Sequence, residues 1–271
     1  MRIAVSAAGI RALVMEARTV GTTLSTDADP ASVGPIGVSG MLADQLAKEL
    51  SAGAASGAIV VGGTDIVARA EVLVRIVAGD PTPDDEQLVR AADARGIPIV
   101  VVQLWPQADW TMPFVLTPFV VECRAGEGFP VDEIADRIVE ATESSAVLAS
   151  RAPVIEEATR GRLVKSAVLR SALIGLAGAR VGVSRPLLTL EQVRMLSQLR
   201  TVSAGSAVAD ELPVRAGGAV AMLAAGFAFR GLARSVRTVV PAPIAHATVA
   251  AAGTWLIAKA YQVAESRLPS P

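Results

Sequence analysis

The chain has 271 residues, of which 52% are hydrophobic, 19% charged and 3% aromatic. Its length fits two domains, and its composition excludes an intrinsically disordered chain. The single cysteine, Cys123, excludes an intramolecular disulfide bond and favours a reducing compartment. Because the first residues, MRIAVS, lack the apolar core and cleavage site of a secretion signal, we expect a cytoplasmic protein, with inner-membrane association left open.

The formal net charge of −1 conceals two oppositely charged halves. Residues 1–150 hold 10 Lys and Arg against 20 Asp and Glu, whereas residues 151–271 hold 15 against 6. The basic half is therefore expected to meet an anionic partner, such as membrane headgroups, nucleic acid or the acidic half of the same or a second chain. Nucleic acid is the least favoured partner, because aromatic residues for base stacking are scarce and the basic residues are spread among apolar runs.

Loop, helix and strand signals alternate through the first half. Residues 22–40, rich in Gly, Ser, Pro and Asp, predict a loop, and the leucine spacing in residues 41–50 predicts a helix. Thr82 and Pro83 suit the start of another helix, which Gly96 ends, and residues 131–145 predict a third. The apolar runs that predict strands are 57–63, 70–80, 97–102 and 114–122. This alternation predicts an α/β fold with a mostly parallel sheet.

Helical patterns replace strand patterns after Ser150. Residues 160–180 predict a basic helix, and a capping box from Thr189 to Gln192 predicts the start of the next. We therefore expect an acidic α/β domain at 1–148 and a basic, apolar, all-α domain at 149–271. The uncharged stretch 238–258 is long enough to span a bilayer of about 30 Å, but its prolines and small residues make it marginal. Peripheral packing is favoured over spanning.

Two segments of the first half carry a family resemblance. AGDPTPDDEQLVRAADARGIPIVVV resembles the strand, helix and strand that lead to the guanine-specificity motif of translation-factor-like and Era-like GTPases. ECRAGEGFPVDEIADRI resembles the last base-contacting loop of that family. The resemblance covers about residues 34–143 and implies a GTPase-like sheet, but the residues for its chemistry are missing, so the domain is expected to be degenerate.

The phosphate-binding and base-reading motifs of that family are both altered. A phosphate loop needs G-x-x-x-x-G-K-[ST], whose amides and lysine hold phosphate. In the nearest candidate, GPIGVSGML, Gly40 stands in the place of the lysine and Met41 in the place of the Ser or Thr. Gln103 and the three residues after it replace the guanine-reading Asn-Lys-x-Asp. The predicted vestigial nucleotide-binding region comprises Gly34, Gly37, Gly40, Gln103 and Gly126. We expect no enzyme activity, no metal and no cofactor.

The second half resembles, over about residues 160–265, a family of unknown function that occurs behind GTPase domains and in YcjF-like bacterial inner-membrane proteins. Three blocks carry the likeness: PLLTLEQVRMLSQL, AVAMLAAGFAFRGLARSV and VVPAPIAHATVAAAGTWLIAKAYQVAES. The resemblance implies a compact helical domain associated with a membrane or a GTPase, with no known active site.

These patterns together predict a non-enzymatic pseudo-GTPase-like protein that docks on a membrane surface or a protein partner. The docking surface is predicted on one basic helix, at Arg160, Arg162, Lys165, Arg170 and Arg180. The same cations could instead form salt bridges to the acidic domain. Two other functions stay open: a nucleotide-binding switch or weak GTPase that uses backbone amides near Gly34–Gly40, and a self-associating module, which would make the partner a second copy.

Overall fold

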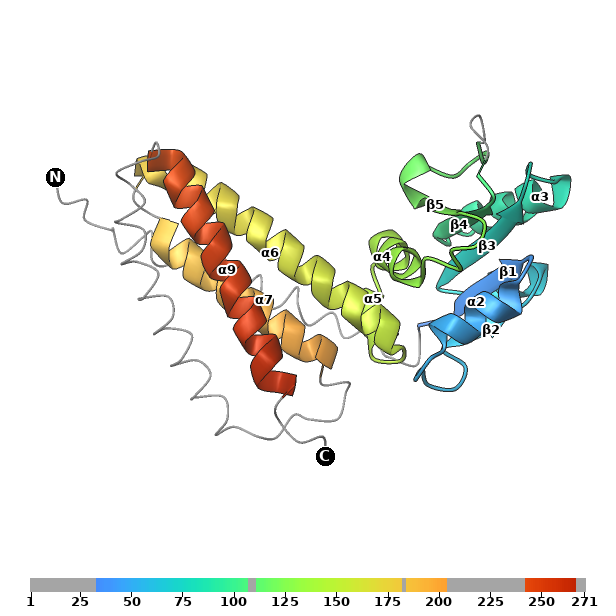
Figure 1. Cartoon of the computed structure of the whole chain (residues 1–271), viewed down its shortest axis with the longest axis horizontal. Coiled ribbons are helices and arrows are strands. Elements are labelled where there is room, and N and C mark those ends of the chain that lie inside the picture. Colours follow the sequence, from blue (N-terminus) through green and yellow to red (C-terminus); the bar gives the residue numbers. More distant parts are fainter. Residues whose placement is uncertain (1–32, 107–110, 182–183, 204–241, 267–271) are drawn as a thin grey trace. The chain divides into compact units, whose positions relative to one another are not determined.

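The computed structural model describes residues 33–106, 111–181, 184–203 and 242–266 (Figure 1). They form an α/β part, residues 33–149, followed by a helical part made of three long helices. The predicted class is therefore confirmed: an α/β fold with a parallel sheet and flanking helices precedes C-terminal helices.

Five parallel strands make one sheet in the order β2-β1-β3-β4-β5. The strands are β1 (Ile36–Gly40), β2 (Ile59–Val61), β3 (Val72–Ala78), β4 (Ile99–Leu104) and β5 (Val120–Cys123). Parallel strands all end at one edge, so the carboxyl ends of β1, β3 and β4 lie close together. Ligands of open α/β sheets usually bind at that edge, where the strand order reverses. Here the reversal falls between β1 and β3.

Alternate residues of the strands pack against helices on the two faces of the sheet. The helices of this part are α2 (Ala43–Leu50), α3 (Pro83–Asp93), α4 (Val131–Ala141) and α5 (Ser145–Ala149). Val38, Val74 and Val102 share one core with α2 and α4. Leu73 and Val101 point to the other face, where they pack against α3. Two short 3-10 turns, η2 (Thr64–Ala68) and η3 (Thr117–Phe119), complete this part.

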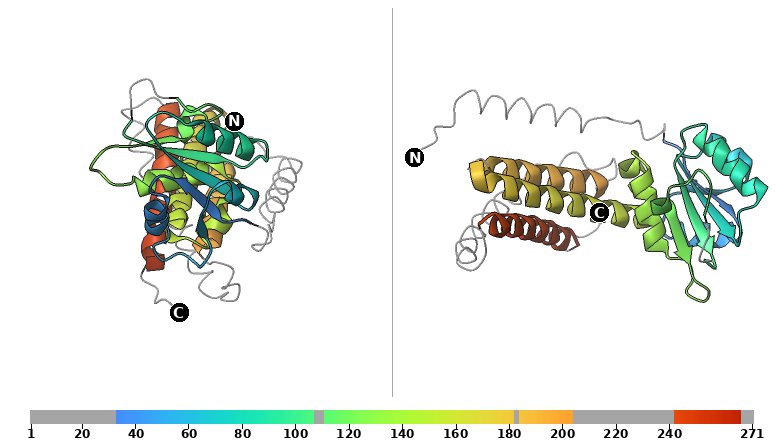
Figure 2. Two further views of the ribbon diagram at one scale, coloured as in Figure 1. Left: turned by 90° about the vertical axis from the view of Figure 1, so that its right-hand side faces the viewer. Right: turned by 90° about the horizontal axis from the view of Figure 1, so that it is seen from above.

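The helical part contains α6 (Pro153–Val181), α7 (Ser184–Ser203) and α9 (Ala242–Ser266). These helices lie side by side (Figure 2), and their shared core includes Ala167, Met195 and Ile257. Gly175 brings α6 close to α9, because a Cβ at this position would lie 2.7 Å from the carbonyl oxygen of His246. The first turns of α6 also belong to the main core of the sheet, through Ile155 and Ala158.

Three predicted boundaries are wrong. Residues 36–40 form the interior strand β1 and not a loop, because β2 pairs with one of its edges and β3 with the other. The predicted strand 114–122 shrinks to Val120–Cys123, since the 3-10 turn at Thr117–Phe119 precedes it. Helix α7 begins at Ser184, so Thr189 lies inside it and does not cap it.

Candidate functional site

The link between β1 and α2 is too short to form a phosphate loop. Strand β1 ends at Gly40 and α2 begins at Ala43, so only Met41 and Leu42 connect them. A phosphate-binding loop of this type needs several residues between strand and helix, so that successive amides can surround the anion. At the end of β1, Gly40 has a φ of 106°, and a Cβ at this position would lie 2.1 Å from the carbonyl oxygen of Ile76 on β3.

The predicted vestigial nucleotide region does not gather at one place. Gly40 and Gln103 lie at the carboxyl ends of β1 and β4, and Gly126 follows β5 at the same edge. Gly34 precedes β1 at the opposite edge, where a Cβ would lie 2.2 Å from the carbonyl oxygen of Arg69. Gly37 lies within β1, and a Cβ there would come 3.2 Å from Ile66. Gly34 and Gly37 thus allow close packing of the chain and do not face the carboxyl edge.

Two buried polar side chains lie on the α3 face of the sheet near that edge. Ser39 of β1 is 1% exposed, and its Oγ has no hydrogen-bond partner among the described residues. Gln103 of β4 is also buried, and its Nε2 has none there either. Between them on β3 lies Arg75, whose register partner is Ser39. A buried polar group without a protein partner often forms a hydrogen bond with an ordered water molecule. Ser39 and Gln103 alone therefore do not define a ligand site.

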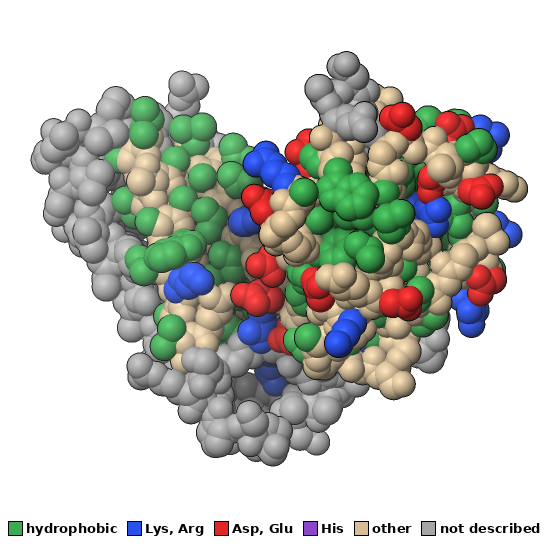
Figure 3. Space-filling view, turned by 45° about the vertical axis from the view of Figure 1, so that its right-hand side comes forward, with side chains coloured by type: hydrophobic (Ala, Val, Ile, Leu, Met, Phe, Trp, Pro, Cys, Tyr) green, Lys and Arg blue, Asp and Glu red, His purple; other side chains and the backbone are tan. Residues whose placement is uncertain are grey.

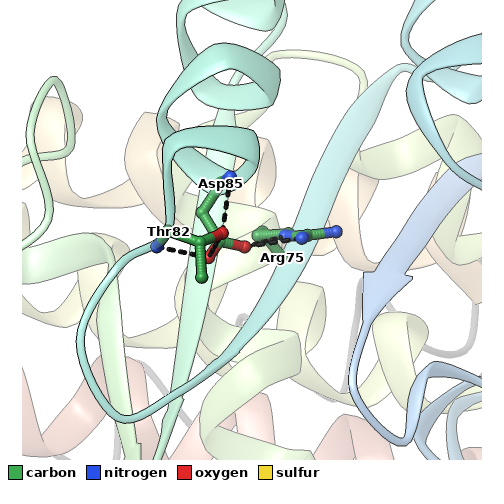
Figure 4. A network of polar contacts seen from close by, with 3 residues as sticks. All are labelled: Arg75, Thr82 and Asp85. Carbon is green, nitrogen blue, oxygen red and sulfur yellow. Dashed lines mark hydrogen bonds and ion pairs between the residues drawn. The ribbon is translucent and has the colours of Figure 1, made fainter.

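Arg75 is held by a network at the start of α3 (Figure 4). Its Nε and Nη2 donate to Oδ1 of Asp85 at 2.8 and 2.5 Å. The other carboxylate oxygen accepts from the backbone N–H and the hydroxyl of Thr82 at 2.8 and 2.6 Å. The Thr82 hydroxyl in turn accepts from the Asp85 N–H, which completes a capping box. The amino end of α3 is therefore satisfied by its own residues and is not open to an anion.

This network also sets the protonation of Asp85. Burial alone would raise the pKa of the carboxyl group, but the hydrogen bonds from Thr82 and Arg75 outweigh burial and hold that pKa below its ordinary value. Asp85 is thus an ionised partner that fixes Arg75 and the helix. The sequence predicted Thr82 as the N-cap, and the structure confirms it; the role of Arg75 depends on a contact across the sheet face that no local pattern reveals.

The described residues include three non-glycine residues in the left-handed backbone region, and all three are large apolar side chains exposed to solvent. Leu42, Trp105 and Phe114 have φ of 60°, 54° and 66°, and 49%, 53% and 58% of their surface is exposed. A non-glycine residue in this region costs on the order of 1 kcal/mol or more. Sequence reasoning missed these positions, because Gly and Asn are the residues that usually mark them.

In the helical part, the predicted basic residues of α6 mostly lie opposite carboxylates. Arg162 and Lys165 approach Glu140 and Asp136 of α4 at 4.0 and 3.8 Å. Arg160 pairs with Glu156 one turn earlier at 2.9 Å, and Arg170 pairs with Glu191 of α7 at 2.5 Å. Arg180 lies in α6, but its side chain is outside the described residues. The ion pairs of Arg162 and Lys165 are long and exposed to solvent, so each contributes little to the stability of the fold.

The outer faces of α6 and α9 expose apolar side chains in helical stripes. Leu169, Leu173 and Leu176 follow Lys165 along one face of α6, and each is exposed. On α9, the exposed apolar side chains include those of Ile244, Trp255, Leu256 and Val263. Figure 3 shows hydrophobic side chains spread over the helical part, with few acidic side chains among them on the face in view. Polar groups are instead buried between the helices, where Thr254 donates to Ser171 at 2.8 Å.

Two further features of the described residues limit the chemistry available. No three His, Cys, Asp or Glu side chains there lie close enough together to hold a metal ion. Burial and the nearby Glu127 and Glu49 raise the pKa of Cys123, and its Sγ contacts the carbonyl oxygen of Gly128 at 3.1 Å. A buried thiol with a raised pKa is a poor nucleophile.

Comparisons with protein-family models, curated proteins and solved structures gave no match. The resemblances to GTPases and to YcjF-like proteins therefore stay predictions from the sequence. Among the described residues, no helix is both long and apolar enough to cross a membrane. Of the uncharged stretch 238–258, residues 242–258 belong to α9, and residues 238–241 lie outside the described ranges.

Proposed function

We propose that this protein is a non-enzymatic, pseudo-GTPase-like docking protein that binds an anionic membrane surface through the outer faces of α6 and α9. One observation carries the proposal: the described surface of these helices combines exposed apolar stripes with cations. The stripe on α6 comprises Leu169, Leu173 and Leu176, and it begins one turn after the exposed Lys165. Helices that present apolar and cationic side chains together lie at membrane interfaces.

The distribution of acidic residues supports lipid as the partner. From Ala158 to Val263, the described ranges contain one acidic residue, Glu191, and the other acidic residues of α6 and α9 lie near their ends, at Glu156, Glu157 and Glu265. Glu191 is buried and paired with Arg170, so it presents no negative charge to a membrane. A cation close to an anionic surface contributes about 1 kcal/mol, reduced by salt.

Apolar burial is expected to contribute more than charge. Asp136 and Glu140 lie beside Lys165 and Arg162, so they compete with lipid headgroups for the same cations. By contrast, burying a leucine side chain contributes about 1.5–3 kcal/mol. Trp255 on α9 suits the headgroup region, because its ring is apolar and its indole N–H is polar. Lys259 is exposed one turn further on the same helix.

The degenerate GTPase-like reading remains part of this proposal. Its GTPase-like part rests on the sequence resemblance, and the two-residue link between β1 and α2, which leaves no room for a phosphate loop, supports the loss of phosphate binding. A weak nucleotide switch is therefore disfavoured, and no described feature favours self-association over lipid binding.

The proposal is tested by vesicle flotation of the full chain, with neutral and with anionic lipid. We expect binding to anionic vesicles, and we expect the triple change Leu169→Gln, Leu173→Gln and Leu176→Gln to weaken it on the order of 100-fold. Leu116→Gln is the matched control, because Leu116 is an exposed leucine of the α/β part. The proposal would be overturned if the wild-type chain bound neither neutral nor anionic vesicles, or if the triple variant bound anionic vesicles as tightly as wild type.

A further inference from the structure

The two strained residues Leu42 and Trp105 lie at the same edge of the sheet. Leu42 comes two residues after the end of β1, and Trp105 directly follows β4. Because β1 and β4 both pair with β3 in parallel, their carboxyl ends lie on the two sides of that strand. Met41 beside Leu42, and Val61 at the end of β2, are also exposed. Exposed apolar side chains thus lie at or just beyond the carboxyl ends of three of the five strands.

The backbone conformation of both residues is one that folding alone would favour glycine for. Leu42 and Trp105 both hold a left-handed conformation that glycine adopts without strain. Each leaves about half of its surface exposed, so burial offsets little of that strain. Strained residues of this kind cluster at binding surfaces, where the surrounding structure holds them in place.

Acidic side chains surround this edge. The first turn of α2 carries Asp44, and the first turn of α3 carries Asp84 and Glu86. Asp80 lies in the link between β3 and α3, and Glu127 lies in the link between β5 and α4. Among the described residues, the cations at this edge are Arg75, which is paired with Asp85, and the exposed Arg124, which directly follows β5, so acidic side chains outnumber the unpaired cation. Figure 3 shows a hydrophobic cluster on the α/β part, with Asp and Glu and also some Lys and Arg side chains around it.

We propose that the carboxyl edge of the sheet is a docking surface for a basic amphipathic helix of a partner protein, anchored by Leu42 and Trp105. An apolar centre with a charged rim is the usual anatomy of such interfaces. The acidic rim attracts a basic segment and repels nucleotides, nucleic acids and anionic lipid. This surface is separate from the lipid-binding faces of α6 and α9, so either proposal can fail without the other.

The test measures binding of a labelled 18-residue amphipathic peptide of leucine and lysine to the full chain, without lipid, by fluorescence anisotropy. We expect saturable binding that weakens about tenfold or more in Leu42→Gly and in Trp105→Gly, as for other buried anchor residues. Both variants should keep or raise the melting temperature, because glycine relieves the positive φ. A matched peptide with glutamate in place of lysine should bind at least about tenfold more weakly.

Phe114→Gly is the matched control variant. Phe114 also combines a positive φ with an exposed aromatic ring, but the guanidinium carbon of Arg90 lies over this ring, 5.1 Å from its centroid. Arg90 lies seven residues into α3, which places it about 10 Å along that helix from the carboxyl edge. We therefore expect Phe114→Gly to leave peptide binding unchanged.

Three results would overturn the proposal. The first is unchanged binding in both Leu42→Gly and Trp105→Gly, or no saturable binding to the wild-type chain. The second is an equal loss of binding in Phe114→Gly, which would indicate general contact with apolar surface. The third is a lower melting temperature in both edge variants, which would show that Leu42 and Trp105 serve the fold.

Discussion

The α/β part and the helical part place apolar side chains differently. The α/β part buries continuous apolar strands on both faces of its sheet, and its exposed apolar residues stand mainly at turns beyond the strands. The helical part instead exposes apolar stripes along α6 and α9, while both parts bury hydrogen-bonded polar groups, Asp85 in the first and Ser171 with Thr254 in the second. The exposed stripes distinguish the helical part and form the surface that the proposed lipid contact would cover.

The largest expected effect concerns the polar network of the α/β part. Asp85→Asn should lower the free energy of unfolding by about 3 kcal/mol, because it leaves Arg75 largely buried without its ionised partner. Denaturant unfolding of the full chain measures the change. Thr82→Ala removes the cap and one hydrogen bond to Asp85 but leaves the Arg75–Asp85 pair, and it should cost about 1 kcal/mol. Equal losses in the two variants would contradict a central role for the Arg75–Asp85 pair.

The same network predicts a pH dependence of stability. Because the folded state holds the pKa of Asp85 below its ordinary value of 3.8, the contribution is fully present above that value. It is lost as the pH falls through the lower pKa of the folded state. We expect wild type to lose more stability in this acid range than Asp85→Asn, as measured by unfolding at a series of pH values. Parallel pH profiles would show that Asp85 titrates normally.

Two glycines of α6, Gly175 and Gly161, differ in whether a Cβ would meet the neighbouring helix α9. Gly175→Ala should destabilise the chain by about 1–3 kcal/mol, because the new Cβ meets the backbone of His246 and Ala247 on α9. Gly161→Ala meets nothing within 4 Å and should stabilise the helix by up to about 1 kcal/mol. The melting temperatures of both variants, measured by thermal unfolding, test these two expected changes in stability. A neutral Gly175→Ala would mean that α6 and α9 do not need their close contact.

The smallest effect on stability is expected from the cations beside α4. The double change Arg162→Gln and Lys165→Gln should alter the free energy of unfolding by less than about 1 kcal/mol, since both ion pairs are long and exposed. It should nevertheless weaken binding to anionic vesicles by roughly tenfold. Asp136→Asn with Glu140→Gln is the opposite control and should strengthen that binding. A large loss of stability with unchanged vesicle binding would assign these cations to the fold.

Much of the fold was predictable because its signals are local. Thr82, Pro83 and Gly96 mark both ends of one helical region, and the apolar run at 70–80 marks β3. Strand β1 was missed because its glycines resemble a loop, and its strand conformation depends on pairing with β2 and β3. The start of α7 was missed because Thr189 and Gln192 fit a capping box that a continuous helix overrides.

The candidate site was less predictable than the fold. The basic helix was visible from the sequence, but the carboxylates opposite Arg162 and Lys165 come from α4, more than 20 residues earlier in the chain. The strained positions of Leu42 and Trp105 carry no signal, because leucine and tryptophan seldom adopt a positive φ. Both proposed surfaces depend on contacts between distant segments or on unusual backbone angles. A local sequence pattern predicts neither of these features.

The central claim, that α6 and α9 face lipid, is tested most directly by the fluorescence of Trp255. In a full chain with Trp105→Phe and Trp110→Phe, Trp255 is the sole tryptophan, and brominated acyl chains quench a tryptophan that enters the bilayer. We expect anionic brominated vesicles to quench Trp255, and we expect Leu169→Gln, Leu173→Gln and Leu176→Gln together to abolish the quenching. Vesicle-bound protein whose Trp255 stays unquenched would contradict the claim.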